Sequence, residues 1–305
     1  MATILITGGS GLIGKALSQK LLAEGHQVRI LSRTPNPQSK IPAFFWDVEK
    51  QEIDEKAFDG IDHLVHLAGE GVADKRWTEK RKKEVIDSRV NSMKLITRVI
   101  KKKNILLKSV VGASATGIYG MVTSDKIFTE TDKGPEDFLT HTCEVWERSY
   151  DEISGLSEKT VVIRISVVLS KQGGALKLLL PLFNMGLGSA VGKGSQYMPW
   201  IHIDDLISVI HHGLFDPDFK GVYNAVAPEH HTSNSFSAAL AKALHKPFFA
   251  PNVPAFALRL LFGEMANVLL LGSRVSSKKL TDAGFVFQYP NLKQAFEKIV
   301  SEKPE

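Results

Sequence analysis

The sequence predicts an α/β fold, in which a doubly wound parallel sheet is followed by a smaller, mainly helical C-terminal region. Two observations predict it. Short apolar, β-branched segments alternate with segments of helical periodicity over residues 1–170. The first of these segments, Thr3–Thr7, also runs directly into a glycine-rich turn and then into a helical pattern. Alternating strands and helices of this kind form a parallel sheet that is covered on both faces.

The glycine-rich turn has the spacing G-x-x-G-x-x-G. A buried strand, a glycine turn and a helix start suit a nucleotide pyrophosphate, because backbone N–H groups face the phosphates and no side chain blocks them. A tight turn without a ligand is the alternative, and the position directly behind a strand argues against it. We therefore expect a dinucleotide site that includes Gly8, Ser10, Gly11, Leu12, Ile13 and Gly14.

The second expected strand, residues 28–32, bears on the choice of dinucleotide. NAD sites place Asp or Glu near the end of this strand to bind the ribose 2′-hydroxyl. The chain has no acidic residue between Gly25 and Trp46, and it offers Ser32 and Arg33 instead. A hydroxyl and a guanidinium suit a 2′-phosphate. Arg33 as a solvated loop residue is the alternative, and we favour NADP(H) over NAD(H), with Ser32 and Arg33 as ligands.

The remaining elements follow the same alternation. Strands are expected at residues 44–47, 63–69, 109–114 and 160–165, and helices at 78–103 and 138–153. Later, Asp204 is expected to cap a helix over 205–215, and residues 285–289 to form a strand. We expect a Rossmann-type NADP-binding domain over residues 1–170, to which part of 195–230 returns, and a smaller substrate-side and helical region over 171–305.

Composition indicates a soluble globular protein with a large core. The chain has 305 residues, 43% of them hydrophobic, and a net charge of +5. Its basic run at residues 76–83 also contains an acid and precedes apolar residues, which favours a solvated helix face over nucleic-acid binding. The apolar residues 256–271 are interrupted by polar ones and are too short to span a bilayer. They predict a helix packed on the core or on another subunit, which leaves an oligomer open.

The cellular compartment follows from two features. The chain has a single cysteine, Cys143, which suits a reducing compartment. Its N-terminus reads as a strand and lacks the regions of a secretory signal. We expect a cytoplasmic protein with no nucleic-acid or membrane partner.

Motifs along nearly the whole chain resemble those of extended short-chain dehydrogenase/reductases of the nucleotide-sugar epimerase type. They are T-G-G-S-G-L-I-G at residues 7–14, H-L-A-G at 66–69, S-A-T-G-I-Y-G at 114–120 and P-W-I-H-I-D-D-L at 199–206. L-A-G-E at 67–70, K-E-V-I-D-S-R at 83–89 and F-L-x-x-x-C-x-x-W-E at 138–147 narrow the resemblance. It points to the atypical branch of sugar-nucleotide-epimerase-like proteins, the epimerase family proteins.

One departure from this resemblance concerns catalysis. Extended members carry Tyr-x-x-x-Lys on the helix after the fifth strand, where the Tyr transfers a proton and the Lys lowers its pKa and holds the nicotinamide ribose. The resemblance aligns Leu139 and Cys143 with these positions, and the chain contains no Tyr-x-x-x-Lys. Leu139 cannot transfer a proton, and a small buried thiol is the favoured interpretation of Cys143.

Two other residues are candidates for the missing chemistry. The resemblance places Ser114 where the family has its catalytic Ser or Thr, and Tyr119 lies in the loop that follows. A phenol there could reach a substrate over the nicotinamide, and a packing role is the alternative. The sequence shows no Ser/His/Asp constellation or metal-ligand cluster.

The resemblance also implies cofactor contacts beyond the glycine turn. Arg89, where extended members have Asn, offers a charged donor to phosphate or ribose. Glu84 would pair with a ribose hydroxyl or with Arg89, and a plain helix-surface pair is an equal alternative. The other implied contacts are Leu67, Ala68, Gly69 and Val168.

Two functions remain open. The first is an NADP(H)-dependent oxidoreductase or epimerase-like enzyme acting on a small substrate. The second is a catalytically silent NADP(H) sensor that acts through a partner. The missing Tyr-x-x-x-Lys favours the sensor, and the intact cofactor motifs favour the enzyme.

Overall fold

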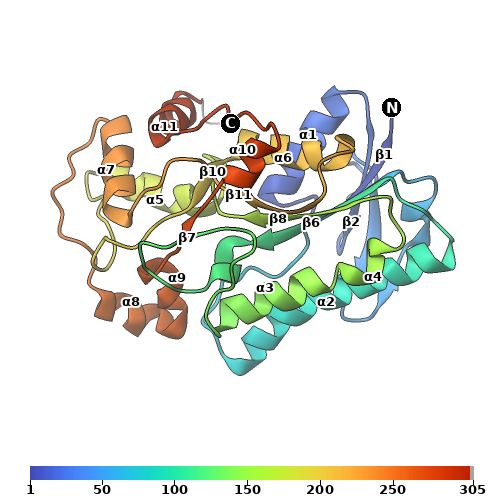
Figure 1. The fold of residues 1–305 in the computed structure, drawn as a ribbon, viewed down its shortest axis with the longest axis horizontal. Coiled ribbons are helices and arrows are strands. Elements are labelled where there is room, and N and C mark those ends of the chain that lie inside the picture. The colour runs from blue at the N-terminus through green and yellow to red at the C-terminus, as the bar shows by residue number, and fades with distance from the viewer. Residues whose placement is uncertain (303–305) are drawn as a thin grey trace.

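The computed structural model describes residues 1–302 and contains a large, mostly parallel sheet with helices on both faces (Figure 1). In spatial order its strands are β11 (Gly221–Ala225), β8 (Thr160–Ile165), β6 (Ser109–Ala115), β5 (His63–His66), β1 (Thr3–Thr7), β2 (Gln27–Ser32), β3 (Ala43–Asp47) and β4 (Glu52–Ile53). All neighbours are parallel except β3 and β4. The predicted fold class, a Rossmann-type α/β fold, is confirmed.

Two apolar layers enclose this sheet. One layer contains α1 (Leu12–Ala23) and α6 (Ile203–Phe215), and the other contains α2 (Glu79–Lys102), α3 (Phe138–Arg148) and α4 (Asp151–Ser154). Side chains alternate along β1: Ile4 and Ile6 pack in the first layer, and Leu5 packs in the second. Because both faces are covered, the central strands are apolar on both sides, as the sequence indicates.

The C-terminal part forms a third apolar cluster. It packs α5 (Gly174–Asn184), α7 (Ser233–Ala243) and α11 (Leu292–Ser301) around a parallel pair, β9 (Val167–Leu169) and β10 (Trp200–His202). Residues 203–225 return to the main sheet as α6 and β11. The short elements are η1 (Glu55–Phe58), η2 (Thr116–Tyr119), β7 (Ile127–Phe128), α8 (Ala255–Phe262), η3 (Gly263–Ala266), α9 (Asn267–Leu270), β12 (Arg274–Val275) and α10 (Lys278–Asp282). The division at residue 170 stays a prediction.

Two predicted local features are wrong for the same reason. Helix α6 begins at Ile203, and its cap is His202, whose Nδ1 accepts the N–H of Asp204 at 3.2 Å. Residues 285–289 form no strand, because the carboxylate of Asp205 accepts the N–H groups of Gln288 and Tyr289 at 2.7 and 3.1 Å. In both places a side chain takes the hydrogen bonds that sequence patterns assign elsewhere.

The apolar stretch 256–271 forms three short helices, α8, η3 and α9. Met265 and Ala266 are buried, whereas Phe256, Leu260 and Leu261 are 74%, 81% and 64% exposed. The stretch therefore packs on the protein through only part of its surface. None of the helices in residues 1–302 is long and apolar enough to cross a membrane.

Candidate dinucleotide-binding site

A cleft of about 430 Å³ lies beside the glycine turn, at the carboxyl end of β1. The turn and the first residues of α1 form one wall, together with Leu67 after β5. Val167 and Val168 of β9 and Gly174 and Ala175 of α5 form the rest. The cleft thus lies where open α/β sheets bind ligands, outside the carboxyl ends of the strands.

A larger hollow of about 560 Å³ lies elsewhere, next to Met1, His26 and Lys108. These residues lie near the amino ends of the parallel strands, and two of the lining residues, Ala2 and Lys108, directly precede β1 and β6. Ligands of doubly wound sheets bind at the opposite end. We therefore place the candidate site in the smaller cleft.

The three glycines of the motif, Gly8, Gly11 and Gly14, have different structural roles. Gly8 has φ +68° and lies so close to Leu67 that a Cβ would be 3.0 Å from its carbonyl carbon. At Gly14 a Cβ would be 2.4 Å from the Gly8 oxygen, so this glycine permits packing of the helix on the turn. At Gly11 a Cβ would approach only the Gly8 oxygen, at 3.3 Å, and Gly11 lines the cleft. Gly11 is therefore the glycine whose missing side chain leaves room for a ligand.

Two helices begin at this cleft without a side-chain cap. Gly11 precedes α1 and Gly173 precedes α5, and neither helix has an acidic residue in its first turn. The two ends are close together, since a Cβ at Gly173 would lie 3.3 Å from the Leu12 side chain. Their first N–H groups lack partners within the helix and carry partial positive charge. The arrangement fits a nucleotide pyrophosphate.

The L-A-G turn after β5 is held by a buried polar chain that sequence reasoning missed. The Thr7 hydroxyl oxygen accepts the N–H groups of Leu67 and Ala68, both at 3.1 Å. Thr7 Oγ1 also lies 3.2 Å from His66 Nδ1, and His66 Nε2 lies 3.0 Å from Ser92 Oγ. The side chains of Thr7, His66 and Ser92 are fully buried. The signal available in the sequence was their position, since Thr7 and His66 end apolar strands and Ser92 lies on the apolar face of α2.

The protonation state of His66 follows from the hydrogen bonds that it forms with Thr7 and Ser92. Ser92 donates its hydroxyl proton to the carbonyl of Arg89 at 2.8 Å. It must therefore accept from His66 Nε2, and His66 Nδ1 then accepts from Thr7. Burial lowers the pKa of His66 to about 4. A neutral His66 thus connects α2 to the turn that borders the cleft.

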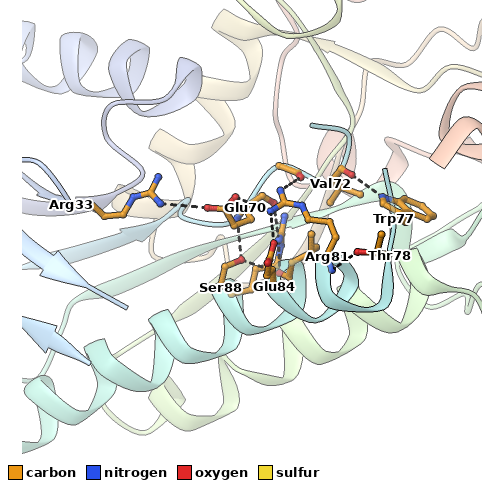
Figure 2. Close-up of polar contacts among 11 residues, drawn as sticks. Arg33, Glu70, Val72, Trp77, Thr78, Arg81, Glu84 and Ser88 are labelled. Atoms are coloured by element: carbon orange, nitrogen blue, oxygen red, sulfur yellow. Dashed lines mark hydrogen bonds and ion pairs between the residues drawn. The ribbon is translucent and has the colours of Figure 1, made fainter. Parts of the chain in front are cut away.

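The predicted 2′-phosphate ligands lie at the end of β2. The Ser32 hydroxyl accepts the N–H of Thr34 at 3.2 Å. The Arg33 side chain is 79% exposed, and its Nη1 lies 3.6 Å from Oε1 of Glu70. Figure 2 shows the two side chains pointing toward each other. Arg33 is thus free to turn toward an anion. The contact with Glu70 joins two loops that are far apart in the sequence, and the sequence gives no signal for it.

Glu84 does not pair with Arg89, so that predicted alternative is wrong. Its carboxylate lies 3.1 Å from Nη1 of Arg81, the residue one turn earlier on α2 (Figure 2). This matches the plain helix pair, though with Arg81, whose guanidinium is buried. Arg81 also contacts Glu70 Oε2 at 3.1 Å and the Gly71 carbonyl at 2.8 Å. The role of Glu84 toward ribose stays a prediction.

Arg89 is buried beneath the L-A-G turn. Its Nη1 donates to the carbonyls of Glu70 and Val85 at 3.0 and 2.7 Å, and its guanidinium lies 4.5 Å from the Trp146 ring. A Cβ at Gly69 would be 3.0 Å from the Arg89 guanidinium carbon, so the glycine makes room for it. Burial lowers the Arg89 pKa, and its Nε has no partner among the described residues. Arg89 is only 6% exposed and does not line the cleft, so its predicted contact with phosphate or ribose stays a prediction.

The two predicted catalytic hydroxyls belong to one buried network. Ser114 donates to Glu147 Oε1 at 2.6 Å, and Arg164 binds both carboxylate oxygens of Glu147 at 2.8 Å. Tyr119 accepts from Arg164 Nη1 at 2.9 Å and donates to Asn224 Oδ1 at 2.6 Å. The network connects strands β6, β8 and β11 to α3.

These contacts do not favour a catalytic role for Tyr119. The side chain is fully buried, and burial raises its pKa to about 12 although Arg164 opposes the shift. Ser114 is also buried, and its hydroxyl is engaged with Glu147. Cys143 is buried as expected, and burial raises its thiol pKa to about 12. The catalytic roles of Ser114 and Tyr119 stay predictions.

A model of the NAD dependent epimerase/dehydratase family matches residues 4–226, which include the cleft and its glycine turn. The chain belongs to this family. A second model, described as a domain of unknown function, matches residues 253–299. The predicted resemblance is confirmed, and so is the expectation that the chain is an NAD(P)-binding, epimerase-family protein.

Relatives in the family extend over the whole chain. Epimerase family protein YfhF of Bacillus subtilis is 32% identical over 302 residues, which cover 98% of each protein. Epimerase family protein SDR39U1 of Homo sapiens is 34% identical over 301 residues, which cover 98% of this chain and 99% of the human protein. Both carry the epimerase-family name, and neither name favours a sensor.

Solved structures agree in fold. The structure of human SDR39U1 isoform 2 with NADPH superposes with a TM-score of 0.87 and 32% identity, covering 99% of this chain and 100% of that one. The complex of the UDP-glucose 4-epimerase of Thermus thermophilus with NAD has a TM-score of 0.77 and 21% identity, with 98% of each chain covered. The second likeness concerns the fold alone.

Proposed function

We propose that this chain binds NADP(H) and acts as an oxidoreductase or epimerase-like enzyme on a small-molecule substrate. The observation that carries the proposal is the cleft between two uncapped helix starts, with Gly11 open toward it. The cleft suits a pyrophosphate. Arg33, which directly follows β2 at the carboxyl end of the parallel strands, suits a 2′-phosphate. The NADPH in the structure of human SDR39U1 supports the choice of nucleotide.

Different residues would bind different parts of the cofactor. The N–H groups at the start of α1 would bind the pyrophosphate, and Ser32 and Arg33 would bind the 2′-phosphate. Residues 67–69 would line the nicotinamide side of the pyrophosphate, and Val168 would contact the nicotinamide; Leu67 and Val168 both line the cleft. When bound, the nicotinamide would donate or accept a hydride.

The proton that accompanies such a transfer needs a source. Leu139 has no titratable group, and the Cys143 thiol is buried with a raised pKa. The hydroxyls of Ser114 and Tyr119 are engaged in the buried network. These contacts favour a proton that comes from water or from the substrate itself, rather than from one of these side chains.

Titration calorimetry tests the cofactor assignment. The native protein should bind NADPH more tightly than NADH. Arg33→Ala should weaken NADPH binding by about 1–3 kcal/mol, because it removes a charge-assisted contact with the 2′-phosphate, and should leave NADH binding nearly unchanged. Equal affinity of the native protein for both nucleotides would contradict the proposal.

A second experiment tests the enzymatic part. Purified protein is incubated with NADPH and a panel of carbonyl compounds and nucleotide sugars, and NADPH consumption and sugar isomers are measured. Turnover of any member supports an oxidoreductase or epimerase-like enzyme. Tight NADPH binding with no turnover of any member would contradict the enzyme while leaving the binding site intact.

A further inference from the structure

The second strand lacks the acid that NAD sites place there, yet the fold brings a carboxylate from another loop close to the Arg33 side chain. Glu70 lies in the loop between β5 and α2, and its Oε1 is 3.6 Å from Arg33 Nη1 (Figure 2). Residues 25–46 contribute no acid of their own. Arg33, the residue expected to bind the 2′-phosphate, therefore has a negatively charged side chain beside it.

The Glu70 carboxylate is held from one side. Its Oε2 accepts from Arg81 Nη1 at 3.1 Å, and Arg81 is almost fully buried. The backbone of Glu70 is held as well: its N–H donates to Ser88 Oγ at 3.0 Å, and its carbonyl accepts from Arg89 Nη1 at 3.0 Å. All three partners belong to α2. Glu70 thus keeps its place whether or not Arg33 is near it.

The contact between Arg33 and Glu70 is weak by comparison. The two side chains are 79% and 37% exposed, and an exposed pair at this distance contributes little to stability. An incoming phosphate can therefore draw Arg33 away from Glu70 at small cost. The carboxylate stays behind, since Arg81 and the backbone contacts hold it.

We propose that Glu70 determines the nucleotide selectivity of the site by limiting the preference for NADP(H) that Arg33 confers. Its carboxylate repels a 2′-phosphate and competes with it for Arg33. The same carboxylate accepts a hydrogen bond from the 2′-hydroxyl of NAD(H), as the acid on the second strand does in NAD sites. The inference rests on the proposed function, because it concerns how the same site distinguishes its two nucleotides.

The test compares 2′,5′-ADP with 5′-AMP, which differ only in the 2′-phosphate. Calorimetric affinities are measured for the native chain, Glu70→Gln and Arg33→Ala/Glu70→Gln. Glu70→Gln should raise affinity for 2′,5′-ADP by ~3- to 10-fold and leave that for 5′-AMP unchanged or lower. In the double variant this gain should shrink, since Arg33 can no longer use the freed charge.

Asp74→Asn is the matched control. Asp74 is an exposed carboxylate in the same loop, and it forms no ion pair among residues 1–302. The Asp74→Asn variant should leave the ratio of the affinities for 2′,5′-ADP and 5′-AMP unchanged, whereas Glu70→Gln changes this ratio. The melting temperature of each variant without nucleotide shows whether the loop is intact.

The outcomes separate the two claims. A native chain that binds neither probe nor NADPH contradicts the proposed function and, with it, this inference. A native chain that binds both probes, with the same affinity ratio in Glu70→Gln, overturns the inference alone. An equal shift from Asp74→Asn overturns it too, because the effect would then be one of net charge.

Discussion

The Tyr119 hydroxyl has a partner on each side. It donates to Asn224 Oδ1 at 2.6 Å and accepts from Arg164 Nη1 at 2.9 Å, and the ring is fully buried. Buried polar atoms of this kind are costly to leave unpaired. At the scale of the single residue, Tyr119 therefore stabilises the fold by connecting β8 and β11 through one oxygen.

Replacing this oxygen should affect stability first. Tyr119→Phe should lower the free energy of unfolding by about 1–3 kcal/mol, because Asn224 and Arg164 each lose a buried partner. Urea unfolding followed by circular dichroism measures the loss. The control is Tyr150→Phe, since the Tyr150 hydroxyl donates one hydrogen bond, to the Ala113 carbonyl at 2.8 Å, within the described residues 1–302. Its loss should be smaller. Stability equal to the native chain, with turnover slowed about 10²–10⁴-fold, would instead assign Tyr119 to catalysis.

At the scale of the element, the start of α1 combines a ligand site with a packing contact. Gly11 has φ −76° and ψ 174°, an extended backbone that any residue adopts. Its lack of a side chain matters for the cleft rather than for the chain conformation. Gly14 matters for packing, because it lies against the backbone of Gly8. The same motif therefore has separable functions.

Two substitutions distinguish these functions. Gly11→Val should abolish stabilisation by NADPH while the chain stays folded, because its branches occupy the space for the pyrophosphate. Gly14→Ala should destabilise the protein, by about 1–3 kcal/mol, because its Cβ would meet the Gly8 oxygen. Thermal melts with and without NADPH measure both effects. A folded Gly11→Val variant with a normal NADPH shift would place the site elsewhere.

At the scale of the whole molecule, three buried histidines occupy different parts of the core. Burial lowers the pKa of His63, His66 and His202 to about 4 each. His63 bonds Ser109 at 2.7 Å, and His202 caps α6. Each is neutral in the folded protein at neutral pH, whereas in the unfolded chain each titrates near 6.5.

This difference predicts a stability that falls on acidification. Between about pH 6.5 and 4 the unfolded chain binds more protons than the folded one, so stability is present above this window and is lost as the pH falls through it. Each histidine should contribute a slope of about 1.4 kcal/mol per pH unit inside the window. Urea unfolding at several pH values measures the slope. His66→Gln should reduce this slope by the contribution of one histidine, about 1.4 kcal/mol per pH unit. An unchanged slope would contradict the assignment for His66.

The candidate site was predictable to the extent that it is local. The glycine turn and Leu67 of the L-A-G turn line the cleft as expected, because each follows a strand at the same end of the sheet, and the role of Arg33 stays a prediction. The partners of Arg33 and Tyr119 were not found. Tyr119 and Asn224 are 105 positions apart, and Glu70 reaches Arg33 across the sheet edge. No spacing rule relates residues at such separations.

The order of residues along the chain was enough to predict the alternation of strands and helices over residues 1–170 and the glycine turn after β1. These features depend on backbone geometry and on side-chain periodicity within a few residues. The three-dimensional fold was needed to show that β9 pairs with β10, that the returning segment forms the edge strand β11 next to β8, and that His202 rather than Asp204 caps α6. It was also needed to show that the Glu70 carboxylate lies 3.6 Å from the Arg33 guanidinium. Hydrogen bonds and charges find their partners by distance in space, and residue order does not specify that distance.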